Sequence, residues 1–313
     1  MAVDTSAVAP ALRPAGSGMR RYQWASILSA AARSPRGAAG AALASVVVLV
    51  ALIGPLVAPY PPNAFETVPF ARPSGHFLLG SDYVGRDVLS RLLNGGWVLL
   101  VMAVAATAIG VAAGAMAGMS AAYLRGKTDG IIMRAVDVLL SFPQIVFALL
   151  LVSLIGPKLW LIVLAVGLSH APQVARVLRS ATLDISERDY VKAVELQGMP
   201  PTKIMRTEIL PNLIAPLMVE AGLRLTYSIV IIAGLAFLGF GQPPPSANWG
   251  MMINENQIGL GLNPWAVIAP AALIALLTIG TNTFSDAVAR VALGVDRRPE
   301  EAAIISDLGP GGD

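Results

Sequence analysis

The sequence has no cysteine and only two histidines among its 313 residues. Without cysteine there can be no disulfide bond, thiolate metal site or catalytic thiol. The histidines, His76 and His170, lie on opposite sides of the membrane predicted below, with no carboxylates clustered around them, so neither a metal site nor a catalytic residue is indicated. Charged residues make up only 13% of the chain and the net charge is +3, which gives no reason to expect nucleic-acid binding.

Apolar residues are abundant: 55% of the chain is hydrophobic and the mean hydropathy is +0.68. One soluble core would not need so much apolar surface. Crossing the hydrocarbon layer of a membrane takes about 20 apolar helical residues. The runs of that kind are 37–58, 97–124, 131–155, 159–175, 213–240 and 264–293. The fourth is short and interrupted by His170 and Pro172. We therefore predict an all-α integral membrane protein with about six transmembrane helices.

The orientation follows from the lysines and arginines, which flank membrane helices mainly on the cytoplasmic side. Seventeen of the 22 basic residues lie in the four segments 1–36, 125–134, 176–206 and 290–298, and the loop 241–263 has none. Both termini are therefore predicted to be cytoplasmic. Composition further predicts that residues 1–36 and 296–313 are disordered and flank a transmembrane domain at 37–295.

A predicted cytoplasmic loop, residues 176–212, contains the signals of two short helices. The first is expected to be capped by Ser186 and to end at Gly198, which suits the left-handed position after a last turn. The second is expected from Thr202 towards Ile209, with a stop at Pro211. The first helix has a small, partly apolar face, which consists of Tyr190, Ala193, Val194 and Gln197. Its spacing allows two interpretations: a face that binds a partner protein, or a helix lying on anionic lipid.

This loop resembles that of the permeases of binding-protein-dependent ABC importers, which carry Glu-Ala-Ala, then Gly, then Ile-x-Leu-Pro. With Gly198 and 209–211 aligned, Glu-Ala-Ala falls on Lys192, Ala193 and Val194, so that Ala193 and Gly198 keep the core residues. The resemblance implies a coupling helix seated in a cleft of an ATPase subunit. The coupling residues that it implies are Asp189, Tyr190, Lys192, Ala193, Val194, Glu195, Gly198, Ile209, Leu210 and Pro211.

Residues 79–91 read L-G-S-D-Y-V-G-R-D-V-L-S-R and resemble a motif of the second permease of oligopeptide, dipeptide and nickel importers. Helical spacing predicts an amphipathic helix near 82–95 at the outer interface, with Asp87 and Arg91 paired, and favours a structural anchor over a substrate contact. We also expect Trp249 and Trp265 at the outer headgroup level. The outer-face residues implied by the resemblance are Asp82, Gly85, Arg86, Asp87, Ser90, Arg91, Trp249 and Gly250.

Ionisable and polar residues within the predicted spans are candidates for a transport pathway, because they are costly in a bilayer. Glu220 and Arg224 are four residues apart in the fifth span. They either line the pathway or form a neutralised pair that packs against a partner permease. Pro143 and Gln144 in the third span suit either a cavity wall or an ordinary kink.

Taken over most of the chain, the resemblance implies a permease bundle of the type I ABC importers, in a bacterial inner membrane, serving oligopeptides or dipeptides. The implied partners are a second homologous permease, two ATPase subunits or one fused ATPase, and an extracytoplasmic solute-binding protein. ATP and Mg would be bound by the ATPases, and this chain would bind no cofactor and catalyse no reaction. Nickel or other metal chelates and other small solutes remain alternative substrates. An ion-coupled secondary transporter would need midplane carboxylates and usually an internal repeat, and a channel would need a filter-like segment.

Overall fold

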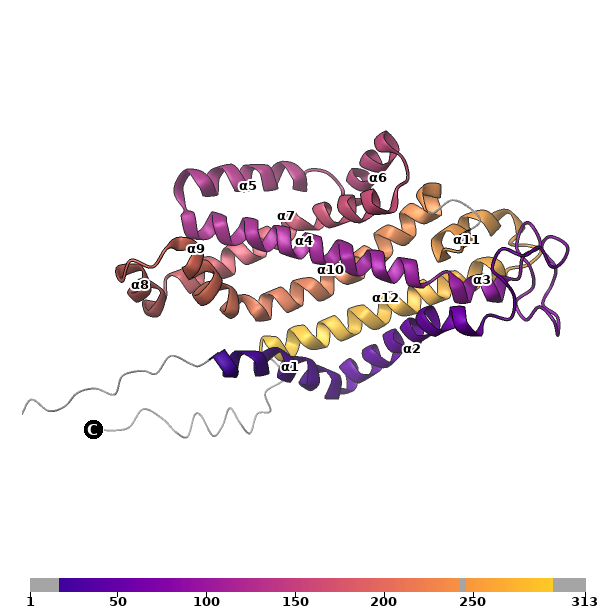
Figure 1. The fold of residues 1–313 in the computed structure, drawn as a ribbon, viewed down its shortest axis with the longest axis horizontal. Helices are drawn as coiled ribbons and strands as arrows, with labels where there is room; N and C mark the ends of the chain where they lie inside the picture. The colour runs from indigo at the N-terminus through magenta and orange to yellow at the C-terminus, as the bar shows by residue number, and fades with distance from the viewer. Residues whose placement is uncertain (1–16, 242–245, 295–313) are drawn as a thin grey trace, which may run out of the picture.

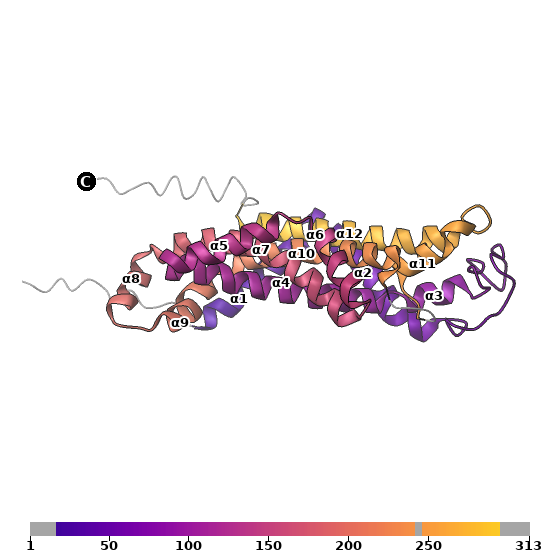
Figure 2. The same ribbon diagram turned by 90° about the horizontal axis from the view of Figure 1, so that it is seen from above.

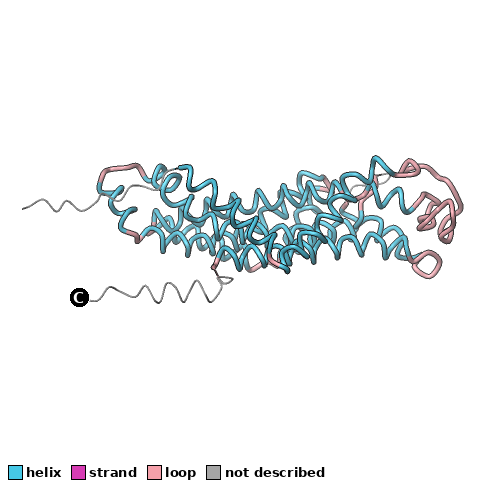
Figure 3. Tube along the Cα trace, turned by 90° about the horizontal axis from the view of Figure 1, so that it is seen from below, coloured by secondary structure: helices cyan, strands magenta, loops and turns pink. Residues whose placement is uncertain are grey.

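The computed structural model describes residues 17–241 and 246–294, with side chains from residue 25 onward. Within these residues the protein is a helical bundle without β-strands; a single β-bridge joins Ser81 and Asp87. The bundle is elongated and flattened, and most of its helices run along its long axis (Figures 1 and 2). The loops gather at its two ends (Figure 3).

The α-helices, in chain order, are α1 (Ser17–Arg33), α2 (Pro35–Val57), α3 (Val88–Asn94), α4 (Trp97–Leu124), α5 (Gly126–Leu140), α6 (Gln144–Ile155), α7 (Leu159–Ser186), α8 (Asp189–Leu196), α9 (Pro201–Ile204), α10 (Ile214–Leu235), α11 (Trp249–Asn256) and α12 (Trp265–Ala292). Two π-helical segments, Met205–Ile209 and Ala236–Phe240, and two 3₁₀ turns, Leu210–Leu213 and Gln257–Gly259, complete the helical structure. Figure 1 shows α5 and α6 along one edge of the flattened bundle and α2 along the other.

Among the described residues, five helical stretches are long and apolar enough to cross a membrane, and a sixth crossing is formed if α5 and α6 count as one span. The expectation of about six spans is therefore confirmed. The third span, however, is bent by 84° between α5 and α6. Pro143 explains the break, because it has no N–H to donate and its extended backbone starts a new helix at Gln144.

The fourth span differs from the expectation, because α7 continues through Pro172 and ends at Ser186 rather than near Ala175. Its 28 residues make a helix about 42 Å long. His170, Pro172 and Val174 are all buried against the rest of the bundle. Tertiary packing thus holds the helix together where the proline removes one hydrogen bond. A helix of this length reaches beyond the hydrocarbon layer, which is about 30 Å thick.

A close contact joins α4 to α7 along three glycines of α4 spaced four residues apart. A Cβ atom at Gly110 or Gly114 would lie 2.6 Å from a backbone oxygen of α7, and one at Gly118 would lie 2.4 Å from another. Small residues at this spacing let two membrane helices approach until their backbones touch. α2 approaches α12 in the same way, at Gly40 and Gly280.

The N-terminal region differs from the expected disorder of residues 1–36, because α1 occupies Ser17–Arg33 and α2 begins at Pro35. Ser34 separates the two helices and caps α2 by accepting a hydrogen bond from the Gly37 N–H at 3.1 Å. The predicted disorder of residues 1–16 and 296–313 lies outside the described residues.

The basic segments of the sequence gather at one end of the bundle. Figure 1 shows α8, α9 and the turn between α4 and α5 at this end, and α3 and α11 at the other. We refer to the first as the cytoplasmic end and to the second as the outer end, because positive charge favours the cytoplasmic side.

Candidate functional site

The cytoplasmic loop begins where α7 projects from the bundle. Ser186 is the last residue of α7 and its hydroxyl donates to the Leu183 carbonyl, so it does not cap the next helix as expected. α8 starts at Asp189, three residues later. Gly198 has a φ angle of +78°, the left-handed conformation predicted for it. A Cβ atom there would meet nothing within 4 Å, so space inside this chain does not require glycine.

The second part of the loop does not end at Pro211, contrary to the expectation. α9 passes through the π-helical segment and the 3₁₀ turn directly into α10, so the helical path runs without interruption from Pro201 to Leu235. Pro211 lies in the first turn of the 3₁₀ segment, where a missing N–H is tolerated. A displacement of α9 is therefore transmitted to a transmembrane helix.

The loop is anchored on its inner side and open on its outer side. Val191 of α8, Ile204 and Ile209 are fully buried and pack with residues of α7 in an apolar cluster. The exposed residues of this segment include Lys192, Ala193, Glu195, Leu196, Gln197 and Gly198. Leu196 is 90% exposed, whereas Val194, which was predicted for the open face, is half-buried. The loop therefore combines an anchored apolar side with an outer surface on which Leu196 is exposed.

Lys192, which stands where the resembling permeases have Glu, takes part in an intramolecular ion pair. Its Nζ lies 3.1 Å from a carboxylate oxygen of Glu187, and Glu187 also binds Arg125 at the end of α4. Hydrogen bonds from Arg125, which has the larger effect, and from Lys192 hold the pKa of Glu187 below its usual value. Glu187 therefore ties α8 to the end of α4, a role that sequence analysis did not identify.

At the outer end, most residues of the 79–91 motif are buried, and they are not arranged along an interfacial helix. Only 88–94 is helical, because Asp87 caps α3 by accepting from the Ser90 N–H at 2.7 Å instead of pairing with Arg91. Asp82 accepts from the Arg86 N–H at 2.9 Å and pairs with the Arg86 Nε at 2.6 Å. Gly85 lies between them with a φ angle of +93°, and a Cβ atom would stand 2.0 Å from the Thr67 carbonyl oxygen.

The motif is joined to α11 by a carboxylate far away in the sequence. Glu255 accepts from Arg91 at 2.9 Å and from Arg86 at 3.3 Å, and both guanidinium groups are buried. Burial raises the pKa of Glu255, an effect that outweighs the opposing influence of Arg91 and Arg86. With Asp82, these residues form a group of two cations and two anions, which we call the outer ion cluster. Glu255 is a site residue that sequence analysis missed, because its partners lie 164 and 169 positions earlier.

Trp249 was expected at the outer headgroup level but is fully buried, and its indole N–H donates to the Leu92 carbonyl at 2.7 Å. Gly250 packs close to α10, where a Cβ atom would lie 2.5 Å from the Ala233 carbonyl oxygen. Both residues therefore fix α11 to the bundle. Trp265, by contrast, is 46% exposed, as its predicted position requires.

Inside the membrane, the predicted pair is formed: Arg224 Nε lies 3.2 Å from Glu220 Oε2. The two residues are 8% and 5% exposed. The Arg224 guanidinium also lies 5.4 Å from the centre of the Tyr227 ring. The two buried side chains therefore neutralise each other's charge within α10.

Gln144, at the bend of the third span, begins a buried chain of polar groups that crosses four helices. Its amide lies 3.4 Å from His170 Nδ1, His170 Nε2 lies 3.0 Å from the Ser228 hydroxyl, and Ser228 lies 3.1 Å from the Thr107 hydroxyl. His170 is fully buried. The structure thus brings together α6, α7, α10 and α4 through polar side chains, a role for His170 that sequence analysis did not predict.

Comparison with known proteins adds to this geometry. Residues 91–292 match the family described as binding-protein-dependent transport system inner membrane component. The chain belongs to this family. It is a multi-pass inner-membrane permease component of such a system.

Two curated relatives cover most of this permease. The di/tripeptide transport system permease protein DppC of Pseudomonas aeruginosa (strain UCBPP-PA14) is 34% identical over 259 residues, which are 80% of this chain and 86% of that protein. A protein of Brucella suis biovar 1 (strain 1330), named as a peptide transport system permease protein, is 33% identical over 248 residues, 79% of this chain and 83% of that protein.

A chain of the inward-facing MetNI methionine ABC transporter has a similar structure, with a TM-score of 0.51 and 21% sequence identity. The similarity covers 66% of this permease and 96% of that chain. At this identity it shows the fold alone, which is that of a type I ABC importer permease. The expected fold class is therefore confirmed.

Proposed function

We propose that this permease is one of two related membrane subunits of an ATP-driven importer for oligopeptides or dipeptides. The names of its curated relatives support peptides as the solute class. An extracytoplasmic solute-binding protein would deliver the peptide at the outer end. Two ATPase subunits, or one fused ATPase, would bind ATP and Mg and perform the hydrolysis. This chain would itself bind no cofactor.

The observation on which the proposal rests is the construction of the cytoplasmic loop. α8 stands beyond the membrane at the end of an α-helix of 28 residues, with its inner face anchored and Leu196 exposed. The chain then continues from α9 into α10 without a break. An ATPase that grips α8 and closes on its nucleotide would therefore displace both α7 and α10.

The pathway would open beside α10 when these two helices move. His170 of α7 and Ser228 of α10 are 3.0 Å apart through their polar atoms, and Glu220 and Arg224 lie on the same helix as Ser228. Separation of α7 from α10 would leave His170 and Ser228 without each other as partners and free to bind the amide groups of a peptide, whereas Glu220 and Arg224 would keep their pair within α10. Pro143 and Gln144 would form the adjoining wall, at the bend of the third span.

The proposal is tested by introducing a charge at the exposed leucine. The complex is purified through a tag on this chain, its subunits are identified by mass spectrometry, and ATP-driven uptake of a labelled dipeptide is measured in proteoliposomes. Leu196→Glu should reduce ATPase retention and uptake at least about tenfold, because an exposed interface anchor contributes about 1.4 kcal/mol or more. The thermal stability of the chain should stay within about 0.5 kcal/mol, because the Leu196 side chain is 90% exposed.

Asp184→Asn, at an exposed position in the last turn of α7, serves as the control and should leave both readouts unchanged. Retention of the ATPase by Leu196→Glu would show that α8 is not the coupling element. Gly198→Val, which would place a bulky side chain at a left-handed residue, should also uncouple uptake while leaving membrane insertion intact. If an excess of a nickel chelate, but not of unlabelled dipeptide, inhibited uptake, the proposed substrate class would be wrong.

A further inference from the structure

A large cavity opens at the cytoplasmic end, between the junction of α1 and α2 and the last turns of α12. Its volume is about 1370 Å³. The polar and charged residues that line it are Arg33, Ser34, Arg36, Thr283, Asp286 and Arg290. It lies outside the coupling loop, the outer ion cluster and the polar chain around His170, and none of the roles discussed above uses it.

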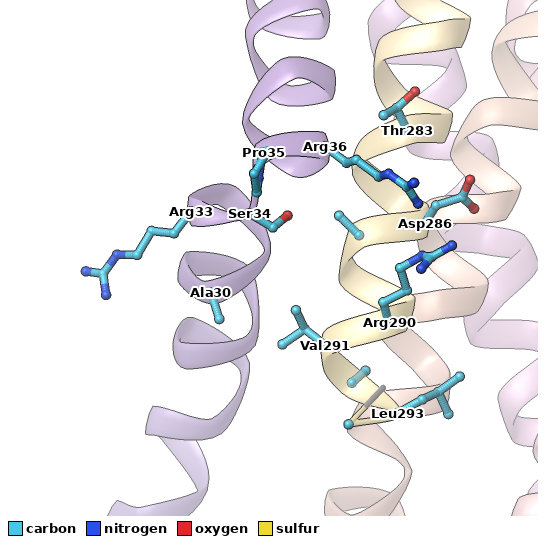
Figure 4. A pocket seen from close by; sticks show the side chains of 13 residues that line it. Ala30, Arg33, Ser34, Pro35, Arg36, Thr283, Asp286, Arg290, Val291 and Leu293 are labelled. Atoms are coloured by element: carbon cyan, nitrogen blue, oxygen red, sulfur yellow. The ribbon is translucent and has the colours of Figure 1, made fainter. Parts of the chain in front are cut away.

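The charge of this cavity is positive, because the described residues that line it include three arginines and one carboxylate. Figure 4 shows the side chains of Arg36 and Arg290 extending from two helices towards the space beside Asp286, whereas Arg33 points away. Within the described part of the chain, neither Arg36 nor Arg290 has a carboxylate within ion-pair distance. The arginines Arg125, Arg176 and Arg179, at the same end of the bundle, all do.

The start of α2 adds to the positive potential. Ser34 caps this helix and Pro35 is its first residue, so the first turn of α2 faces the cavity. The aligned peptide dipoles of a helix give its first turn a partial positive charge, although here Pro35 has no N–H and Ser34 accepts from that of Gly37. A polar group that occupies the cavity therefore meets two guanidinium groups and a helix N-terminus, which together favour an anion.

Towards the membrane interior, the same sides of both helices become apolar and remain exposed. Leu43 lies seven residues after Arg36, and Ile279 lies seven residues before Asp286, so each is two turns away on nearly the same side of its helix. Leu43 and Ile279 are 38% and 55% exposed. They lie about 10 Å from the charged residues along the helix axes, at 1.5 Å per residue. The site thus combines an anion-binding head region with an apolar wall below it.

We propose that this cavity binds the headgroup of an anionic phospholipid of the cytoplasmic leaflet, with its acyl chains along the exposed sides of α2 and α12. A basic recess between membrane helices at the cytoplasmic surface suits such a lipid. The apolar wall distinguishes this occupant from a soluble phosphate, which would use the head region alone. The proposal does not depend on the transported solute.

The test measures lipid binding to the full-length chain within its purified complex, in phosphatidylcholine nanodiscs, by native mass spectrometry at increasing phosphatidylglycerol content. Each arginine near the surface contributes about 1 kcal/mol, which is about fivefold in affinity. Arg36→Gln with Arg290→Gln should therefore weaken phosphatidylglycerol binding about 30-fold. Asp286→Asn should strengthen it, because the substitution removes the one carboxylate among the described residues that line the cavity.

Arg33→Gln is the matched control, since this arginine borders the cavity but points away from it, and its effect should stay below about twofold. Arg36→Lys with Arg290→Lys keeps the charge and should retain most of the binding, which separates electrostatic binding from a change in folding. Unchanged binding in the double glutamine variant would overturn the proposal. So would displacement of the lipid by inorganic phosphate, which would identify a soluble anion as the ligand, or equal affinity for added zwitterionic phosphatidylethanolamine.

Discussion

The two ends of this permease are held together by different forces. At the outer end, four buried charges connect the 79–91 motif to α11, and their side chains are at most 6% exposed. At the cytoplasmic end, the ion pairs that hold α5 and α8 are mostly open to water: Arg176 and Asp137 are more than half exposed, as are Glu187 and Lys192. Buried pairs hold one geometry, because breaking them strands a charge, whereas exposed pairs exchange readily with water.

This difference agrees with the two proposed roles: binding of a solute-binding protein at the outer end and movement by an ATPase at the cytoplasmic end. An outer surface that receives a binding protein benefits from a fixed shape, since a preorganised surface loses little entropy on binding. A loop that is moved by an ATPase needs a firm attachment to α7 and α10 but few other constraints. The apolar cluster around Val191 and Ile204 supplies that attachment. The glycine-rich contact between α4 and α7 connects the two ends.

The largest loss of stability is expected from a substitution in the outer ion cluster. Among the described residues, Arg91→Met leaves Glu255 paired with Arg86 alone, at a site where these side chains are at most 6% exposed. Breaking a buried pair costs about 3–5 kcal/mol. We therefore expect a large fall in the thermal unfolding temperature of the detergent-solubilised chain.

Arg176→Gln is the comparison at the cytoplasmic end, because it removes an exposed pair with Asp137. It should cost less than about 1 kcal/mol. The double variant Arg91→Met with Glu255→Gln should lose less than the sum of its single substitutions, since it strands no charge. Equal losses of stability for Arg91→Met and Arg176→Gln would show that the buried outer ion cluster stabilises the fold no more than an exposed ion pair does.

A smaller effect is expected between the two ends, where α4 touches α7. At Gly114 a Cβ atom would lie 2.6 Å from the Ala171 carbonyl oxygen and 2.6 Å from the Val174 Cβ. Gly114→Ala should therefore force the helices apart and cost about 1–3 kcal/mol, measured by thermal unfolding.

Gly130→Ala on α5 is the control, because a Cβ atom there meets nothing within 4 Å. It should be neutral or stabilising by up to about 1 kcal/mol, since alanine is the better helix former. If both alanine variants were equally stable, the close approach of α4 and α7 would not contribute to the fold.

The helical spans were predictable because the membrane imposes both their length and their apolar character. Their exact course was not. Pro172 was interpreted as an interruption of the fourth span, yet α7 continues because neighbouring helices bury the residues around the proline. Pro143 read as a cavity wall or a kink, and the bend of 84° depends on how α5 and α6 pack against α7. Such packing is set by residues distant in the sequence.

The outer motif shows the same limit in a functional region. Its residues were recognised, but helical spacing placed Asp87 opposite Arg91, whereas Arg91 pairs with Glu255 on α11 and with Asp82. No local pattern encodes a contact across 164 residues. His170 was similarly read only as a poor metal ligand, because its partners Gln144 and Ser228 come from two other helices. The coupling loop was more predictable at Gly198, where the backbone conformation itself favours glycine.

The smallest effect is expected at the cytoplasmic end, in the exposed ion pairs of Glu187. Arg125 and Lys192 hold the pKa of Glu187 below its usual value of 4.5. A carboxylate with a lowered pKa stabilises the folded loop fully above its unfolded pKa, and this contribution is lost as the pH falls through the lowered pKa of the folded state.

The attachment of α8 to α4 should therefore weaken only in acid. Hydrogen exchange of the α8 amides, corrected for the intrinsic rate at each pH, should show a loss of protection below about pH 4.5 in the unaltered chain. In Glu187→Gln, protection should be lower at neutral pH and should not change across this range. The outer ion cluster provides the contrast: α3 and α11 amides should keep their protection in Glu187→Gln at neutral pH. A loss of protection in α11 as well would mean that the two ends are coupled, and that the exposed tie at Glu187 contributes to more than the position of α8.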